Sequence, residues 1–145
     1  MRRRRGPHAA TGRWGERLAR RYLCRRGLRV LGRNVELGHG ELDLVAEAAD
    51  GTLVVVEVKA GLTFRGLGPE RRVDHVKRRQ LITLTRALIH AKRWHGRPWR
   101  IDVITVTGRR PRFRPLEWVW IQAMLRVPAD RRPEVSWFRG VVSGV

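Results

Sequence analysis

The sequence predicts a single α/β domain in which strands and helices alternate. Three segments have strong strand character, and two others repeat their apolar residues with the period of a helix. The chain of 145 residues is long enough for one hydrophobic core of ordinary size and too short for two. The predicted strands are residues 41–47, 53–60 and 99–107, and the predicted helices are residues 13–26 and 74–93.

The first helix is expected from about Arg13 to Arg26, because Gly27 is well suited to cap its C-terminus. Its apolar residues gather on one broad face when they are projected around the helix axis. Glu16 lies at the edge of that face, so we expect its carboxylate to lie along the boundary of the core. The apolar residues are Trp14, Leu18, Ala19, Tyr22 and Leu23.

The order of the remaining segments predicts how the sheet is connected. Residues 28–31 and 34–37 are short and strand-like, and residues 38–40 form a turn. The helix of residues 74–93 lies between the strands of residues 53–60 and 99–107. This order predicts a right-handed crossover, with those two strands parallel or nearly adjacent. Asp102, in the last of these strands, is expected to be a structural residue that pairs with Arg100.

The two ends of the chain are expected to lie outside the main body. Residues 1–10 are predicted to be a flexible basic arm, residues 11–126 the domain, and residues 127–145 a loosely held C-terminal extension. Trp137 and Phe138 are the side chains that would dock this extension. Residues 116–124 are expected to form a last edge strand or a short helix, after a loop of residues 109–115 that is rich in Pro and Arg.

The charge balance points to a polyanionic partner. The chain carries 32 Lys and Arg residues against 13 Asp and Glu residues, a net charge of +19. Nucleic acid is the favoured partner because each phosphate contact releases condensed counterions. An anionic membrane is disfavoured, because no amphipathic basic helix dominates the chain and no segment is apolar enough to span a bilayer. With no apolar stretch after its basic first residues, the protein is expected to be cytoplasmic.

Two carboxylates and a lysine have the spacing of a catalytic group. Side chains alternate along a strand, so Glu41 and Asp43 share one face, and Leu42 and Leu44 are expected on the other. Asp43 and Glu57 share a face of the hairpin if residue 48 lies opposite residue 52. The loop then has three residues, 49–51, and ends on a left-handed glycine. A two-residue turn at residues 50–51 would instead place Asp43 opposite Val58, and we favour the three-residue loop.

In the three-residue arrangement, the group is suited to metal chemistry. Asp43 and Glu57 supply hard oxygen ligands for Mg²⁺ or Mn²⁺, and water and phosphate would complete the coordination. Lys59, on the same face as Glu57, would stabilise charge developing on a phosphate or lower the pKa of an attacking water. Glu41 and Glu16 are candidates for further ligands or for a base. The alternative is a solvated strand face with an ordinary cross-strand ion pair.

The spacing of Asp43, Glu57 and Lys59 resembles the motif of the PD-(D/E)XK nuclease superfamily, and the flanking residues resemble the YraN-like family of small bacterial proteins. The resemblance covers about residues 12–124. It is carried by Gly15-Glu16, Leu18-Ala19, Tyr22-Leu23, Gly27, Arg33-Asn34, Gly40 to Val45, Val56 to Lys59, Val73, Lys77-Arg78, Arg100 to Val103 and the segment from Trp118 to Met124.

The resemblance implies a restriction-endonuclease-like (tRNA-endonuclease-like) core, a three-layer fold with a mixed β-sheet flanked by helices. It also implies phosphodiester hydrolysis, with Asp43, Glu57 and Lys59 in the superfamily roles. Glu16 matches a helix carboxylate that some Holliday-junction-resolving relatives place near the metal. The chain departs from the family at Gly61, where an Arg is usual, and Arg65 is a candidate substitute.

Several basic residues are candidates for contact with the nucleic acid. Lys77 and Arg78 begin the second predicted helix, whose positive end favours phosphate. Arg110 and Arg112 lie in the basic loop. Taken together, the residues predict a metal-dependent nuclease for structured DNA, with DNA favoured over RNA, as a monomer or homodimer. The alternative is a non-catalytic nucleic-acid-binding module, for DNA or for RNA and the ribosome.

Overall fold

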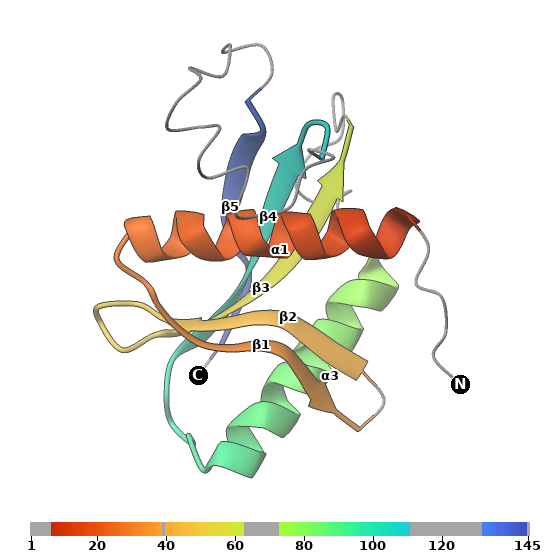
Figure 1. The fold of residues 1–145 in the computed structure, drawn as a ribbon. Coiled ribbons are helices and arrows are strands. Elements are labelled where there is room, and N and C mark those ends of the chain that lie inside the picture. Colours follow the sequence, from red (N-terminus) through yellow and green to blue (C-terminus); the bar gives the residue numbers. More distant parts are fainter. Residues whose placement is uncertain (1–6, 39, 63–72, 111–131, 145) are drawn as a thin grey trace.

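The computed structural model describes residues 7–38, 40–62, 73–110 and 132–144, and for residues 7–10 it describes the backbone alone. Five strands form one mixed sheet in the order β1-β2-β3-β4-β5 (Figure 1). The strands β3 and β4 are parallel, and the other neighbours are antiparallel. The elements are α1 (Pro7–Arg25), β1 (Arg29–Leu37), β2 (Gly40–Glu47), β3 (Leu53–Gly61), α3 (His75–Lys92), β4 (Trp99–Thr107) and β5 (Glu134–Gly144).

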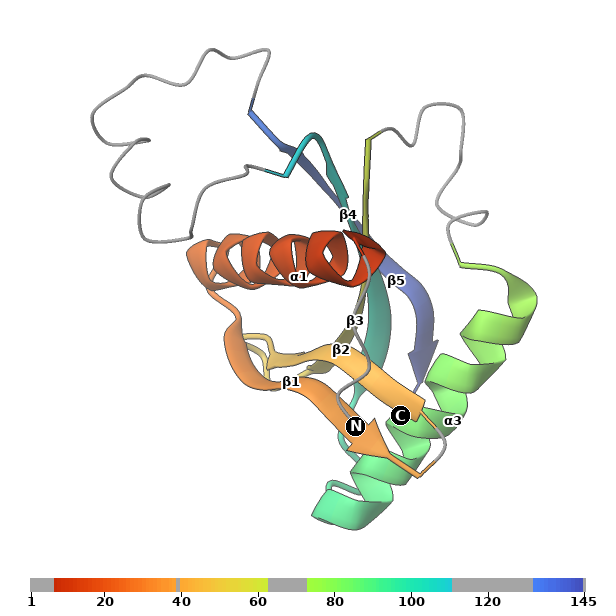
Figure 2. The same ribbon diagram turned by 45° about the vertical axis from the view of Figure 1, so that its right-hand side comes forward.

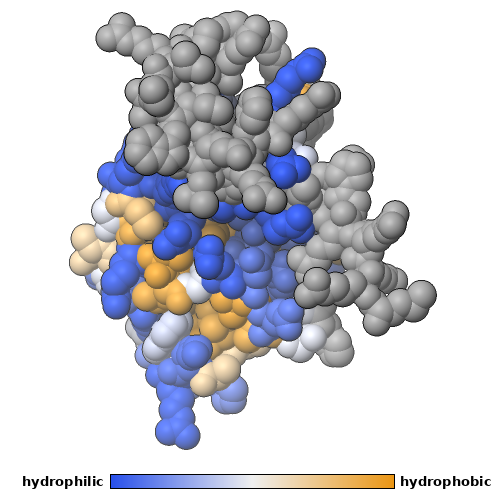
Figure 3. Space-filling model, in the orientation of Figure 1, coloured by the Kyte–Doolittle hydropathy of each residue, from blue (hydrophilic) through white to orange (hydrophobic). Residues whose placement is uncertain are grey.

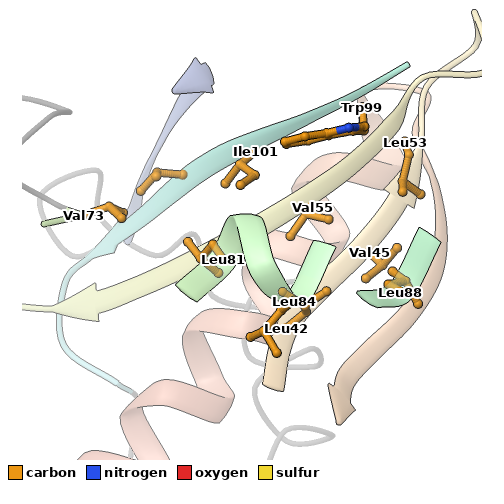
Figure 4. Packing of buried hydrophobic residues seen from close by; sticks show 11 residues of the cluster. Leu42, Val45, Leu53, Val55, Val73, Leu81, Leu84, Leu88, Trp99 and Ile101 are labelled. Atoms are coloured by element: carbon orange, nitrogen blue, oxygen red, sulfur yellow. The ribbon is translucent and has the colours of Figure 1, made fainter. Parts of the chain in front are cut away.

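The sheet lies between two helices, α1 on one face and α3 on the other (Figure 2). Alternate residues of β3 divide between the two sides: Val54 and Val56 pack in the cluster under α1, whereas Leu53 and Val55 pack in the cluster under α3 (Figure 4). A strand covered on both faces is apolar on both faces, which explains the nearly continuous valine run of β3. The predicted three-layer α/β arrangement with a mixed sheet is confirmed.

The hairpin between β2 and β3 has the predicted three-residue loop. Ala48 N donates to Thr52 O at 3.0 Å, and Gly51 N donates to Ala48 O at 2.9 Å. Gly51 has a φ of 84°, the left-handed conformation that glycine adopts without strain. The register follows from this loop, because Glu47 pairs with Leu53 and Leu44 pairs with Val56. The two-residue alternative is therefore wrong.

The crossover from β3 through α3 to β4 gives the predicted parallel neighbours, with Leu53 beside Trp99 and Gly61 beside Thr107. Asp74 caps the start of α3, where its side chain accepts a hydrogen bond from Lys77 N at 2.7 Å. This cap fixes the first turn of α3 and therefore the point from which Lys77 extends. At the other end Arg93, at a φ of 57°, ends the helix.

Two boundaries differ from the predictions. The helix α1 begins at Pro7, before the predicted start at Arg13, so part of the expected flexible arm is helical. Proline is favourable in a first helical turn, and Ala9 and Ala10 favour the helix that follows. The two strand-like pieces expected around residues 28–37 are one strand, β1, with an irregular pairing between Val30 and Gly32.

The expectation of a loose C-terminal extension is also wrong. Residues 134–144 form β5, which pairs antiparallel to β4. Asp102, fully buried on β4, accepts hydrogen bonds from Trp137 Nε1 at 3.0 Å and from Gly140 N at 2.7 Å. It also pairs with Arg100 Nε at 3.1 Å, as predicted. Trp137 further packs edge-on against Tyr22 of α1. A buried carboxylate requires such donors, which is why this strand is docked.

The segment expected at residues 116–124 lies outside the described residues.

Asp102→Ala is expected to lower the free energy of unfolding by about 3 kcal/mol, because it leaves the buried donors of Trp137 and Gly140 without an acceptor. Urea denaturation followed by tryptophan fluorescence measures this loss. Asp50→Ala is the control, since Asp50 is exposed in the hairpin loop and its removal should cost much less stability than the removal of Asp102. Equal losses in the two variants would show that Asp102 does not hold β5.

Candidate functional site

The candidate site lies where β2 and β3 part. Their pairing ends at Leu44 and Val56, although β2 extends back to Gly40 and β3 forward to Gly61. Just past the last pair, Asp43 Oδ2 accepts a hydrogen bond from Val58 N at 2.8 Å. A side-chain oxygen thus satisfies a strand N–H that has lost its backbone partner in the ladder. This bond holds the Asp43 carboxylate in the opening between the two strands, beside Glu57.

The parting of the strands also changes the packing of β2. Leu42 packs in the cluster under α3, near Leu84 (Figure 4), whereas Leu44 packs in the cluster under α1. The expectation that Leu42 and Leu44 share a face is therefore wrong. Strict alternation holds only while a strand keeps its pairing geometry, and β2 turns away from β3 at Asp43.

Glu57 is buried, with only 3% of its surface exposed, and two lysines approach it from different elements. Lys59 Nζ of β3 lies 2.8 Å from Oε1, and Lys77 Nζ of α3 lies 3.2 Å from Oε2. The Lys77 contact is an ion pair without hydrogen-bond orientation, since the buried Oε2 has no hydrogen-bond partner in the described structure. A buried carboxylate with an unsatisfied oxygen is well placed to bind a further cation or donor.

Burial is the main cause of an unusual protonation of Asp43. It raises the pKa of Asp43 to about 7, and the negative charges of Glu57 and Glu16 add to the effect. The hydrogen bond from Val58 N and the charge of Lys77 oppose it. The Asp43 carboxyl is therefore partly protonated at neutral pH. A divalent cation between Asp43 and Glu57 would offset their repulsion and displace this proton.

Glu16 reaches this region from α1. A Cβ on Gly15 would lie 2.5 Å from Cβ of Ala60 on β3, so the glycine is what lets α1 approach the sheet this closely. Asn34 Nδ2 donates a hydrogen bond to Glu16 Oε2 at 3.0 Å. Asn34 was part of the family resemblance but received no role from the sequence, because only the folded structure brings β1 beside Glu16.

The structure brings together Asp43, Glu57, Lys59 and Glu16, and the catalytic and metal-binding roles expected for them stay predictions. It adds Lys77, which was expected to contact nucleic acid and instead pairs with Glu57. It leaves Glu41 exposed on β2, opposite Glu36 of β1. Arg78 is half-buried, and its Nε has no hydrogen-bond partner in the described structure. Arg110 is exposed at the end of β4, and Arg65 and Arg112 lie outside the described residues.

Asp43 and Glu57 are the residues that could hold a metal ion. No three acidic, histidine or cysteine side chains meet at metal-binding distance within the described ranges. This is compatible with Mg²⁺, which commonly takes one or two protein carboxylates and keeps several waters. The unsatisfied oxygen of Glu57 and the repulsion between the two carboxylates fit such an ion. No helix of the described residues is both long and apolar enough to cross a membrane.

Comparison with known proteins places the chain among small proteins of one family. The model of "Uncharacterised protein family UPF0102" matches residues 15–106, which contain every residue of the candidate site. A UPF0102 protein of Mycolicibacterium vanbaalenii is 44% identical over 104 residues, 70% of this chain and 84% of the relative. One of Roseiflexus castenholzii is 40% identical over 106 residues, 70% of this chain and 82% of the relative.

Two solved structures show more distant likenesses. A complex of EndoMS with double-stranded DNA matches with a TM-score of 0.40 and 18% identity, over 63% of this chain and 34% of that one. SfsA of Pyrococcus furiosus in complex with Ca²⁺ matches with a TM-score of 0.33 and 22% identity, over 64% and 39%. The chain thus spans little more than a third of either protein.

Asp43→Asn is expected to change how stability depends on pH in the presence of EDTA. Because the pKa of Asp43 rises from 3.8 to about 7 on folding, the wild type loses unfolding free energy as the pH rises through this range. The variant lacks this loss, so it should gain on the wild type by up to about 1.4 kcal/mol per pH unit. Urea denaturation between pH 4.5 and pH 8 measures the difference.

Asp50→Asn is the matched control, because hydrogen bonds from Thr52 lower the pKa of Asp50. Its difference from the wild type should stay constant above about pH 5. A wild type whose stability does not fall relative to Asp43→Asn between pH 5 and pH 7 would contradict the raised pKa.

Proposed function

The chain belongs to the UPF0102 family, and we propose that it is a nucleic-acid-binding protein that acts as a metal-dependent endonuclease on structured DNA. The observation that supports this most is the carboxylate pair of Asp43 and Glu57 with Lys59 2.8 Å from Glu57, in the opening between two strands. A protein that only binds phosphate gains nothing from carboxylates, because they repel it. The restriction-endonuclease-like relationship inferred from the motif belongs to the same proposal.

In this proposal, Asp43 and Glu57 hold Mg²⁺ or Mn²⁺. The bound ion would polarise a phosphate oxygen and lower the pKa of a water molecule, which is the chemistry that phosphodiester hydrolysis requires. The chain contributes a fixed and partly dry pair of oxygen ligands: Val58 N holds Asp43, and the two lysines hold Glu57. Ligands oriented before the ion arrives do not have to be ordered when it binds.

The lysines have a second role in the proposed reaction. The side chain of Lys59 is 36% exposed, so its ammonium can contact a phosphate while it stays beside Glu57. A fixed positive charge there stabilises the negative charge that develops on the phosphate during attack. Lys77, 28% exposed on α3, is a second cation on the other oxygen of Glu57. Together they compensate the negative charge that a phosphodiester would otherwise meet.

The surface of α1 supports nucleic-acid binding independently of catalysis. Arg13, Arg17 and Arg21 are exposed and spaced four residues apart, so they line one face of the helix. Partial burial and the charges of Arg110, Arg13 and Arg21 lower the pKa of Arg17, which marks a concentration of positive charge. Figure 3 shows hydrophilic side chains spread over this side of the molecule, with apolar ones between them. This arginine face also fits the second candidate function, a binding module without catalysis.

Cleavage is tested at moderate salt on linear, single-stranded, flap and four-way-junction DNA and on structured RNA, with Mg²⁺, Mn²⁺ or EDTA. The wild type should cut a structured DNA only with metal, and Asp43→Asn and Lys59→Ala should each lower the rate about 10²–10³-fold. Asparagine keeps an acceptor for Val58 N, so this variant is expected to fold. Asp50→Asn should cut like the wild type. Salt-sensitive binding without cutting of any substrate would refute the nuclease and favour the binding module, and cutting of RNA alone would refute DNA.

The contribution of the arginine face is measured by the salt dependence of binding to a duplex. Replacing Arg13, Arg17 and Arg21 together by Gln should reduce the slope of log Kd against log salt by about 2–3, since each lost phosphate contact is worth about 0.9. The control replaces Arg79, Arg86 and Lys92, which are exposed on α3, and removes the same charge. Equal slope changes in both variants would show that charge alone, and not this face, determines binding.

A further inference from the structure

We propose that Asn34 is a positioning residue for the candidate metal centre, and that it holds Glu16 as a third acidic group that acts on the bound cation through water. This inference rests on the proposed metal centre of Asp43 and Glu57. It assigns a function to a hydrogen bond, from Asn34 Nδ2 to Glu16 Oε2 at 3.0 Å, that links β1 to α1.

The backbone of Asn34 gives the first argument. Its φ is 47°, and apart from Arg93 no other non-glycine residue in the described part of the chain has a positive φ. Arg93 ends α3, where a left-handed residue is ordinary. Asn34 instead lies within β1, where glycine would adopt this conformation more readily. Among non-glycine residues Asn adopts this conformation comparatively often, and here its side chain also donates the hydrogen bond to Glu16.

The choice of partner gives the second argument. Glu16 lies one turn before Arg20 and one turn after Arg13 on α1, spacings at which a helical Glu commonly pairs with Arg. Yet Glu16 forms no ion pair with any described residue, and its carboxylate goes to a neutral amide. An amide orients a carboxylate without neutralising it. The hydrogen bond engages Oε2 of Glu16 and leaves Oε1 outside it.

The position of Asn34 in the sheet gives the third argument. The register pairs Arg33 with Leu44 and Val35 with Leu42, so Asn34 lies opposite Asp43 across the β1–β2 ladder. The hydrogen bond from Asn34 therefore holds the Glu16 carboxylate toward the part of the sheet that carries Asp43. Glu16, Asp43 and Glu57 thus bring negative charge to one region from α1, β2 and β3. Since no three such groups of the described residues meet at ligand distance, Glu16 would act on the cation through one of the waters that Mg²⁺ commonly retains.

The test is a Mn²⁺ titration of the wild type, Asn34→Gly, Glu16→Gln and the double variant. Glycine accepts a positive φ, so Asn34→Gly removes the hydrogen bond without straining the backbone. It should weaken Mn²⁺ binding about 10-fold, in the range that ligand-supporting residues show. Glu16→Gln should weaken it by a similar factor, and the double variant no further than Glu16→Gln alone, because Asn34 acts only through Glu16. Glu36→Gln, which removes a carboxylate from the same strand, should bind Mn²⁺ like the wild type.

Each outcome separates this inference from the proposed function. If the wild type binds no Mn²⁺, the metal centre itself is refuted. If the wild type binds and Asn34→Gly binds equally tightly, or if the two effects add in the double variant, the role of Asn34 is refuted and the metal centre stands. Thermal unfolding in EDTA supplies the remaining check. A melting temperature of Asn34→Gly more than about 10 °C below that of the wild type would show that Asn34 serves the fold instead.

Discussion

The hydrogen bond from Val58 N to Asp43 is the interaction on which the candidate site depends. Two antiparallel strands can part only if the backbone groups at the point of separation find other partners, and here a carboxylate supplies the acceptor. The same bond holds Asp43 at the point where the strands part, beside Glu57. It also lets β2 turn Leu42 toward α3 while Leu44 stays under α1. The packing of β2 and the proposed chemistry therefore both depend on the point where β2 and β3 part.

Charge compensation explains how acidic groups persist in so basic a protein. Glu57 is buried against two lysines, and Asp43 tends to hold a proton instead of a counterion. The arginines of α1, by contrast, lie on an exposed face, where they repel one another. A polyanion along that face would relieve the repulsion among the arginines, and a cation at the carboxylates would relieve theirs. A nucleic acid supplies both, because its phosphate backbone is the polyanion and its associated metal ions are the cations.

The sequence was sufficient where a local rule decides the outcome. The alternation of side chains, together with the left-handed glycine at residue 51, predicted the register that places Asp43 beside Glu57, and the structure has that register. The crossover helix and the parallel neighbours followed from the order of segments. Glu16 was found because it lies at the edge of an apolar helix face, and the family resemblance pointed to the same residue.

Prediction failed where the answer depends on a partner far away in the chain. Nothing near Lys77 indicates that its ammonium meets Glu57, since α3 must first pack on the sheet. Asn34 gains its meaning only from Glu16 on another element. The prolines at residues 128 and 133 and the glycine near the end of the chain indicate a loose extension, and the donors that Asp102 needs become visible only in the fold. Alternation placed Glu41 on the face of Asp43, but it does not tell how far a strand turns once its pairing ends, and Glu41 is exposed opposite Glu36.

The attachment of β5 has a consequence for the order in which the molecule is made. Asp102 is synthesised well before Trp137 and Gly140. Of the three residues that contact its carboxylate in the finished fold, only Arg100 is present until then. The segment that matches the family model, with both strands of the site, is by then already complete. Until β5 has been synthesised, β4 is therefore the edge strand of the sheet and carries a carboxylate that lacks two of its hydrogen-bond donors. A charge in that position keeps an exposed strand from pairing with other chains, so the residue that secures the finished sheet also protects the unfinished one.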